Sequence, residues 1–464
     1  MPPHTILRSV LAALLLLVGW RESASWAGSA PRLAPGVRLV PVALGHAVEN
    51  LNSQSFSRHT LYSVGQTQYI AFYAANTEVV VGRRTLGTTN WELQATGFHS
   101  NNDRDGHNIV SLGISGDGFL HLSWGMHGNP FHYARSVWPG SLAMVATNMT
   151  GLERAVTYPQ FINCPDGDLL YLFRQGGSGS GDTFLNRYSA TKHSWTNVNF
   201  SAGQQPLIKG VTGRLNCSAY PNYAGFDSQT NLHLTWNWRN QALGIEGNQD
   251  LLHARSPDFG VTWRNGSGAG YVLPITRFSA DCIWPIATNH SLINMAGQCL
   301  DTSDRPVICT WWAPLGSGTA IQYSVIWNDG SCWRANQIGS RTNTSAQTWP
   351  GRPLILCDRQ NRLWVVFSDP MRGNVPTLAW TTDPNRAEWH MADLTSEFMG
   401  NLATCTWGGW EPTHDPVVWE RDGGLHLFYQ PITGVTNGTP ISVLEFDPGT
   451  FLKSQLPGSS AKAR

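Results

Sequence analysis

One strand-like pattern recurs along this chain, with apolar side chains at alternate positions and often a turn carrying Asp, Asn or Gly before it. Alternation of period two is typical of half-buried β-strands. The seven copies occupy residues 68–73, 118–124, 168–173, 231–236, 305–311, 362–367 and 424–429. A chain with this pattern must build its core from repeated β-units.

Further strands and tryptophan-bearing hairpins follow several copies. Residues 131–136 (FHYARS) match residues 251–256 (LLHARS), and five tryptophans close hairpin-like segments: Trp91, Trp195, Trp263, Trp333 and Trp389. Residues 256–263 form a full Asp-box, whose Asp and Gly suit a tight turn beneath a packed Trp. Units of roughly forty to fifty residues with several strands each indicate a β-propeller. We therefore predict an all-β fold, a single seven-bladed β-propeller domain at residues 31–456.

A jelly roll is the alternative fold. A parallel β-helix would need shorter and more regular repeats, and no long amphipathic helix is evident. Residues 457–464 are predicted to be a disordered tail.

The first residues resemble an export signal. Arg8 supplies a positive charge, residues 10–18 are apolar, and small residues follow at 24–30. This pattern predicts a signal peptide at residues 1–30 and a secreted or periplasmic protein with no membrane segment after cleavage. A signal anchor is the alternative.

Charged residues make up 13% of the chain, against about 25% in an average soluble domain. Net charge is zero and charge blocks are lacking, so we expect no nucleic-acid partner. Recognition of an anion must then come from locally placed arginines. The protein is expected to be a monomer.

Eight cysteines are scattered without CxxC spacing. In an exported protein they can pair as disulfides, and the sequence leaves the pairing open. Cys282, His290 and Cys299 could supply ligands to a structural zinc, although their spacing is not a zinc-finger pattern. A structural metal ion, zinc or calcium, therefore stays an open expectation.

Chemistry-bearing side chains gather between residues 105 and 182. His107, His127, Tyr158 and Arg174 stand on turns or at the ends of strand-like runs. His127, Arg174 and Arg239 each follow the end of a repeated strand, so in a propeller they would meet at one mouth. The opposing interpretation is that these are ordinary surface arginines and histidines that satisfy turn carbonyls.

The repeat itself separates structural from functional histidines. His121, His233 and His426 occupy the same place in three strands, which predicts a structural role for them. The Gly-rich run at 176–181 lacks the Lys and helix of a phosphate-binding loop, so close backbone approach or a flexible turn explains it better.

Several of these segments together resemble a known family. Asp105-Gly-His-Asn, the run 118–130, Tyr158-Pro-Gln, Phe173-Arg and the run 248–256 are similar to BNR-repeat-like seven-bladed propellers, a family that includes lyases of ulvan, a sulfated algal polysaccharide containing uronic acid. The similarity is densest at about residues 100 to 265. The linker between His127 and Tyr158 is shorter than expected for an ulvan lyase, which puts the sulfated-rhamnose subsite in doubt.

The resemblance implies a β-elimination reaction that needs no cofactor for catalysis. Arg174 would neutralise the uronate carboxylate, Tyr158 and His107 would divide the base and acid roles, and His127 would hold the sugar or the developing charge. A phenol is a weak base unless a cation lowers its pKa, whereas imidazole is already suited. Weaker candidates for sugar or sulfate contacts are Asn108, Arg239 and Arg135.

The sequence is thus consistent with three functions. The first is a secreted lyase whose partner is an acidic polysaccharide. The second is a sialidase-like glycoside hydrolase, suggested by the Asp-box and by Tyr with Arg. The third is a carbohydrate-binding propeller without catalysis, because fold alone does not specify activity.

Overall fold

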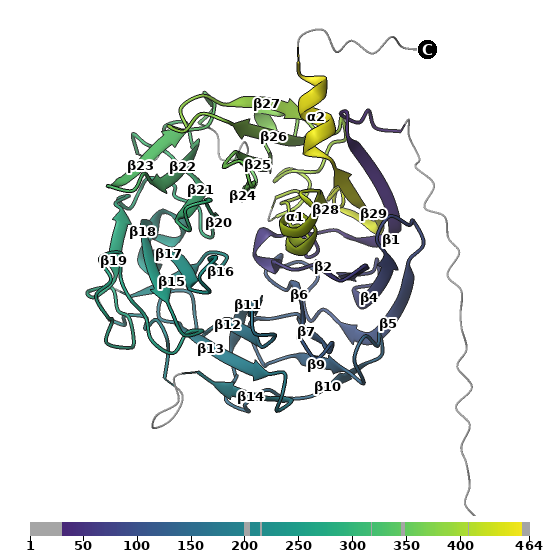
Figure 1. Cartoon of the computed structure of the whole chain (residues 1–464), viewed down its shortest axis with the longest axis horizontal. Coiled ribbons are helices and arrows are strands. Elements are labelled where there is room, and N and C mark those ends of the chain that lie inside the picture. Colours follow the sequence, from purple (N-terminus) through teal and green to yellow (C-terminus); the bar gives the residue numbers. More distant parts are fainter. Residues whose placement is uncertain are drawn as a thin grey trace, which may run out of the picture.

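The computed structural model describes residues 30–198, 205–213, 216–316, 318–344, 349–406 and 408–456. Of the predicted signal peptide only its last residue falls within these ranges, and the predicted tail at 457–464 lies outside them. The described chain is a ring of seven antiparallel sheets (Figure 1), which confirms the predicted propeller.

The first four blades run from the second strand of the chain to the nineteenth. Their strands are β2 (Leu61–Val64), β3 (Thr67–Tyr73), β4 (Glu78–Thr85) and β5 (Glu92–His99); β6 (Val110–Ile114), β7 (Leu120–Trp124), β9 (Tyr133–Ser136) and β10 (Met144–Ala146); β11 (Val156–Asn163), β12 (Leu169–Gln175), β13 (Asp182–Ser189) and β14 (Ser194–Asn197), joined by β8 (His127–Asn129); and β15 (Cys217–Pro221), β16 (Gly225–Phe226), β17 (Leu232–Asn240), β18 (Asn248–Ser256) and β19 (Asp281–Trp284).

The last three blades complete the ring. Their strands are β20 (Gly297–Leu300), β21 (Pro306–Trp312), β22 (Gln322–Asn328) and β23 (Trp333–Gln337); β24 (Leu354–Cys357), β25 (Leu363–Ser368), β26 (Pro376–Thr381) and β27 (His390–Asp393); and β28 (Leu425–Tyr429), β29 (Val435–Phe446) and β1 (Val37–Ala47). Short helices connect or flank them: η1 (Ser55–Ser57), η2 (Gln241–Gly247), η4 (Pro370–Arg372), α1 (Pro416–Asp422) and α2 (Pro448–Ser454).

Each of the seven repeated segments became one strand of a different blade: β3, β7, β12, β17, β21, β25 and β28. The expectation that these strands are half-buried is wrong, because both of their faces are covered. On β12, Leu169, Tyr171 and Phe173 pack toward β9 of blade 2, whereas Leu170 and Leu172 pack toward β17 of blade 4. Stacked sheets bury alternate side chains in two different cores.

The ring closes by pairing the start of the described chain with its end. β1 lies antiparallel to β29, with Val37 opposite Phe446 and Arg38 opposite Glu445. Val40 and Val443 are both fully buried at this junction. Closure removes the exposed sheet edges that an open array would leave at each end.

The Asp-box forms the turn that its sequence predicts. Asp258 accepts a hydrogen bond from the Thr262 backbone at 2.7 Å, and Gly260 has φ of 95°. Trp263 is 1% exposed and donates its indole hydrogen to the Gly260 carbonyl at 2.9 Å.

In the part of the chain described by the structure, no helix has both the length and the apolar character needed to span a membrane. All eight cysteines carry free thiols, so the structure holds none of the disulfides that an exported protein can form.

Candidate active site

Tyr158 lies near the start of β11, at an irregularity of the sheet. β11 pairs with β12 at Thr157, and the pairing resumes at Gln160. The register of the two strands therefore shifts between Thr157 and Gln160. Tyr158 has φ of 56°, a left-handed conformation that costs a non-glycine residue about 1–3 kcal/mol. A bulge of this kind re-aims a side chain. Here it places the Tyr158 ring against Phe56 and Tyr220, with centroids 5.2 and 5.7 Å away.

Arg174 lies on β12 directly opposite Thr157, so the β11–β12 hairpin explains why it reaches Tyr158. Its guanidinium carbon Cζ is 4.9 Å from the centre of the Tyr158 ring and 5.1 Å from that of Tyr220. Arg174 is 3% exposed, and its Nε and Nη1 have no hydrogen-bond partner among the described residues. A buried guanidinium with unused donors is costly unless a ligand supplies the acceptor.

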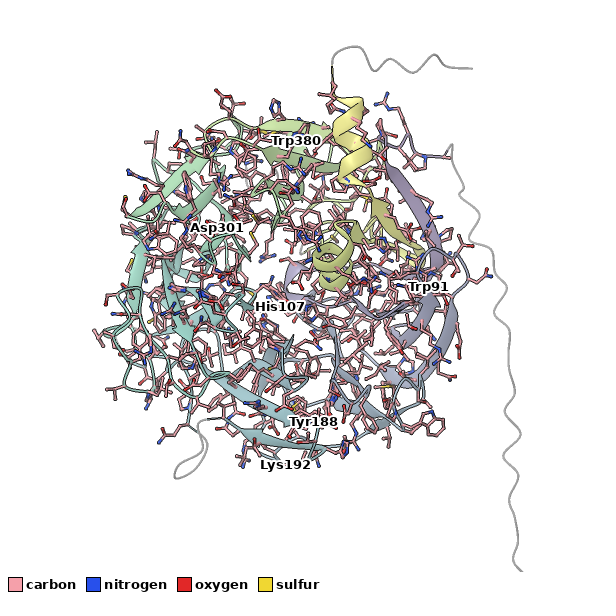
Figure 2. The ribbon with its side chains drawn as sticks, in the orientation of Figure 1. Trp91, His107, Tyr188, Lys192, Asp301 and Trp380 are labelled. Carbon is pink, nitrogen blue, oxygen red and sulfur yellow. The ribbon has the colours of Figure 1, made fainter. Side chains whose placement is uncertain are left out.

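Two imidazoles share one carboxylate beside this hairpin. β8 pairs with β11, His127 opposite Thr157, and the rings of His107 and His127 stack with centroids 3.9 Å apart. Nδ1 of each ring lies 2.6 Å from a different oxygen of Asp105. Because an ionised carboxylate only accepts, both rings must donate from Nδ1, and Nε2 is the basic nitrogen of each. Figure 2 shows His107 close to the centre of the ring, far from Tyr188 and Lys192.

The environment separates the protonation states of these groups. Burial lowers the pKa of His107 to about 4, with the charges of His127 and Arg352 acting in the same direction against Asp105. Although burial opposes it, the hydrogen bonds from His107 and His127 hold the pKa of the Asp105 carboxyl well below its usual range. Burial raises the pKa of Tyr158 to about 12. At neutral pH His107 is therefore uncharged and Tyr158 holds its proton.

Tyr220 of β15 is a second phenol in contact with the same arginine. Burial acts to raise its pKa, but the charges of Arg174 and Arg239 more than offset this and lower it. Arg239 lies over the Tyr220 ring at 4.3 Å and donates from Nη1 to the phenol oxygen at 3.1 Å. Its Nε donates to Asn248 at 2.7 Å and its Nη2 to Asn294. All three guanidinium nitrogens of Arg239 thus donate to protein groups, and Arg239 positions Tyr220.

A third arginine approaches from blade 6. Arg352 lies over the ring of Phe56 at 5.4 Å, and Phe56 stacks on His107 with centroids 5.5 Å apart. Arg352 is paired with Glu411, Nη1 to Oε1 at 2.8 Å. We define the candidate site as the following residues: Phe56, Asp105, His107, His127, Tyr158, Arg174, Tyr220, Arg239 and Arg352.

Sequence reasoning missed Tyr220, Arg352 and Phe56, and it gave Asp105 no role. A signal for Tyr220 was present, because the Tyr-Pro-Asn run at 220–222 repeats the Tyr-Pro-Gln run at 158–160 in the next blade. Arg352 stands far from the other residues in the chain, Phe56 belongs to the preceding blade, and neither carries a comparable motif. Packing of neighbouring blades brings Phe56 to His107, and closure of the ring brings Arg352 to Phe56.

Two predicted substrate contacts are not in the site. Arg135 lies on β9, with its Cζ 4.6 Å from the ring of Phe119 and its Nη1 3.3 Å from the Tyr188 hydroxyl, toward the outer part of the blade. Asn108 is 1% exposed beneath the loop that carries Asp105 and His107, and its Nδ2 donates to the Asp105 carbonyl at 3.2 Å. The prediction of Arg135 came with the family resemblance, whereas the structure gives this residue a place in an outer strand.

The predicted strand histidines are packed inside blades, as expected for a structural role. His121 is fully buried, with Nδ1 2.8 Å from the Tyr133 hydroxyl, and His233 is 3% exposed and lies 3.1 Å from Asp227. His426 lies 3.1 Å from the Gln68 amide in blade 1.

The Gly-rich run lies directly against Arg174. A Cβ placed on Gly181 would come within 2.9 Å of the Arg174 Cδ and 2.7 Å of the Gly177 carbonyl. Ser178, within the run, lies 2.5 Å from the Tyr220 hydroxyl. Close backbone approach is therefore the reason for glycine at 181.

The described residues bring together one group of three side chains that could ligate a metal: Asp105, His107 and His127, with candidate ligand atoms within 4.8 Å of one another. The set considered for zinc, Cys282, His290 and Cys299, is not gathered: Nδ1 of His290 instead lies 3.0 Å from the Ala313 carbonyl. Within this group, Nδ1 of each histidine already donates a hydrogen bond to the Asp105 carboxylate.

Comparison with known proteins now defines the class. Residues 67–341, more than half of the chain, match the BNR repeat-containing family. The protein belongs to this family of β-propellers.

Two solved structures and one short sequence match show which proteins this chain resembles. A PL25 ulvan lyase bound to -[GlcA(1-4)Rha3S]- has 15% identity and a TM-score of 0.61, covering 82% of this chain and 89% of its own. Polysaccharide lyase Uly1 has 14% identity and a TM-score of 0.60, covering 90% of this chain and all of its own. An ulvan lyase short isoform from Alteromonas sp. (strain LOR) is 43% identical over 42 residues, which span 9% of this chain and 8% of that protein. At these identities the structures establish a shared fold.

Proposed function

We propose that this protein is a secreted polysaccharide lyase that cleaves a uronate-containing, sulfated glycan of the ulvan kind by β-elimination. The observation that carries the proposal is Arg174, a buried guanidinium with two unused donors, placed between two tyrosines and beside an imidazole pair. Such a guanidinium suits a carboxylate, which it can bind through two parallel hydrogen bonds at any working pH. The fold shared with ulvan lyases supports the substrate class.

The protonation states support a division of the two proton-transfer roles between His107 and Tyr158. His107, neutral through Nε2, accepts the proton from the carbon next to the carboxylate. The electron pair left behind forms the carbon–carbon double bond, and the glycosidic carbon–oxygen bond breaks. Tyr158, whose pKa is raised to about 12, donates its proton to the departing oxygen, and the proton on His107 then restores Tyr158. General acid–base help of this kind contributes about 10²–10⁴-fold.

Arg174 acts by stabilising charge rather than by moving a proton. As the carbon loses its proton, negative charge spreads onto the substrate carboxylate, and a preformed cation beside it lowers the barrier. Asp105 keeps Nε2 of His107 basic, so we assign it as a positioning residue. His127, with a side chain 33% exposed, is placed to contact the sugar.

The alternative of a sialidase-like hydrolase gains one observation, since three arginines approach the two tyrosines. Their donors argue against it. Arg239 is committed to Tyr220, Asn248 and Asn294, and Arg352 to Glu411 and neighbouring groups. Among the three, only Arg174 has buried guanidinium nitrogens without a hydrogen-bond partner in the described residues, which favours a single carboxylate clamp.

Incubation of the purified protein with ulvan and with other uronate polymers tests the proposal. A lyase yields an unsaturated sugar that absorbs in the ultraviolet, a hydrolase yields reducing ends without that absorbance, and a binding protein yields neither. We expect His107→Ala and Arg174→Ala to abolish the absorbing product without loss of fold. Full activity in either variant would remove that residue from the mechanism.

A further inference from the structure

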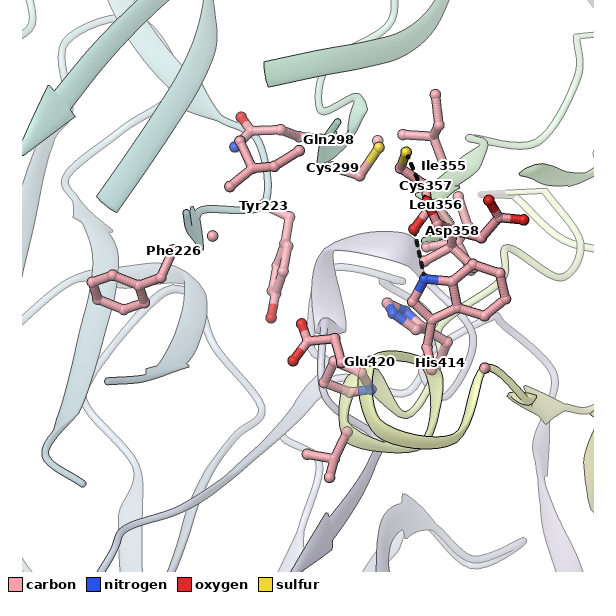
Figure 3. Close-up of a pocket in the computed structure, with 18 of the residues that line it drawn as sticks. Tyr223, Phe226, Gln298, Cys299, Ile355, Leu356, Cys357, Asp358, His414 and Glu420 are labelled. Carbon is pink, nitrogen blue, oxygen red and sulfur yellow. Dashed lines mark hydrogen bonds between the residues drawn. The ribbon is translucent and has the colours of Figure 1, made fainter. Parts of the chain in front are cut away.

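A large cavity lies apart from the candidate site, at the other end of the inner strands. Its volume is about 1050 Å3. Tyr158 lies near the start of β11, whereas Cys164, just past the end of β11, lines the cavity together with the whole of β20 and β24. Helix α1, near the centre of the ring in Figure 1, forms another wall (Figure 3). His107, Tyr158 and Arg174 are absent from its lining.

Arg58 lines this cavity and is the one arginine there that is itself buried, at 8% exposed. Its Nε and Nη2 have no hydrogen-bond partner, and it forms no ion pair with any described residue. Glu411 attracts the guanidinium, but Glu411 is already paired with Arg352 at 2.8 Å and accepts from the Ser55 backbone at 3.0 Å. The backbone of Arg58 has φ of 58°. Strain and unmet donors at one buried residue point to a ligand that compensates them.

The titratable side chains that lie closest to Arg58 are uncharged, so Arg58 is the cation that a bound anion would meet there. Tyr223 lies under the guanidinium at 5.5 Å, and its hydroxyl is 2.6 Å from Nε2 of His59. Burial lowers the pKa of His59 to about 3 and that of His414 to about 4. Both imidazoles are therefore neutral at neutral pH. Nδ1 of His59 is buried and has no partner among the described residues, which leaves it able to hydrogen-bond a ligand oxygen.

The remainder of the lining limits how much negative charge an occupant can carry. Asp227, Asp301 and Asp358 stand around the cavity, the last two paired with the arginines four residues later in the chain. Glu420 of α1 adds a carboxylate near Tyr223 (Figure 3). These acidic groups would repel a polyanion, so the cavity suits a small anion.

We propose that Arg58 anchors a second ligand site, distinct from the candidate active site, for a small anion bearing a carboxylate or a sulfate group. The guanidinium binds the oxyanion through its unused donors, His59 supplies a further contact, and the rings of Tyr62 and Tyr223 flank the bound group. This site does not depend on the lyase reaction.

Thermal melting at constant ionic strength tests the proposal with three sodium salts, acetate, D-glucuronate and sulfate, against chloride. Acetate and glucuronate probe the carboxylate, and sulfate probes the sulfate group. Sulfate also stabilises proteins without binding, so the readout is the saturable shift that wild type shows and Arg58→Gln lacks. We expect Arg58→Gln to weaken binding of the anion roughly tenfold or more.

The matched control is Arg174→Gln, which removes the buried guanidinium of the candidate site and should keep the part of the shift that Arg58→Gln loses. A shift that persists in Arg58→Gln and disappears in Arg174→Gln would place the anion in the candidate site and overturn the proposal. So would equal behaviour of wild type and Arg58→Gln with all three salts.

A second measurement uses wild-type protein alone and covers the case in which Arg58→Gln does not fold. Crystals grown with sodium selenate, a sulfate analogue, should give an anomalous peak within hydrogen-bonding distance of the Arg58 guanidinium. A map with no peak at Arg58 refutes sulfate binding there, and the acetate and glucuronate melts of wild type beside Arg174→Gln then decide the carboxylate.

Discussion

Replacement of Asp105 by Asn isolates the electrostatic and tautomeric work of one carboxylate. Oδ1 of Asp105 receives both the Nδ1 hydrogen of His107 at 2.6 Å and the His107 backbone hydrogen at 3.1 Å. Oδ2 receives only Nδ1 of His127 at 2.6 Å. The Asn carbonyl will therefore occupy the Oδ1 position, because a backbone N–H cannot change its role, and the Asn amide will face His127.

Two consequences follow for the imidazoles. His127 must accept at Nδ1 and so carries its proton on Nε2, whereas His107 keeps its tautomer but loses the charge that raised its pKa. A hydrogen bond to a charged group is worth about 1.5–3 kcal/mol, which corresponds to a loss of roughly 10- to 100-fold in kcat/KM. The pKa of His107 should fall further below about 4.

The assay is the initial rate of ultraviolet-absorbing product, together with nitrogen-15 NMR of the histidine tautomers. Asp117→Asn is the matched control, since Asp117 holds Nδ1 of His193 at 2.8 Å outside the candidate site. It should change kcat/KM less than twofold. An Asp105→Asn enzyme within threefold of wild type, or one in which His107 changes tautomer, would refute the reasoning.

Four further outcomes are expected. Arg174→Lys keeps the charge but loses the planar guanidinium, so kcat should fall by about 10²–10³-fold, as for other transition-state donors. The control Arg135→Lys, outside the site, should stay near wild type. Equal losses of kcat in the two variants would contradict the role assigned to Arg174. Tyr158→Phe should recover most activity on a substrate with a good leaving group at the scissile oxygen, and His107→Ala should not; rescue of both would exclude Tyr158 as the acid. The acid limb of kcat/KM should lie near the pKa of His107, about 4; a limb near 6.5 would show that another group is the base. Thermal stability should fall on acidification, because buried imidazoles have pKa values of about 3 in the folded protein against 6.5 unfolded. Their contribution is present above pH 6.5 and is lost toward pH 3, by about 1.4 kcal/mol per pH unit for each histidine; calorimetry with an unchanged midpoint between pH 7 and 5 would contradict this. These imidazoles belong to His59, His121 and His253.

The sequence predicted the fold closely because the determining signal is local. Each repeated strand carries its alternation within six or seven residues, and every one of the seven became a blade strand. The error over half-burial had a physical reason: alternation shows that two faces differ, and in a propeller both faces meet a neighbouring sheet. On β12 the two sets of side chains enter different cores.

The candidate site could be predicted only in part. His107, His127, Tyr158 and Arg174 were found because turns and strand ends mark them locally, and pairing of β8, β11 and β12 then brings them together. Arg135 was predicted from the family resemblance, which says nothing about distance from the ring centre, and it lies beside Phe119 and Tyr188 in the outer part of the blade.

What the chain's own residue pattern determined was the unit of the structure, a short β-meander with apolar alternation, and the number of times it occurs. The tertiary structure decided which side chains meet. Phe56 and Arg352 are separated by almost three hundred residues, and Arg352 reaches Phe56 because β1 pairs with β29 and closes the ring. Phe56 in turn stacks on His107 of the next blade. Strand alternation depends on neighbours two residues apart, whereas convergence at the centre depends on the angle between blades, which no single segment encodes.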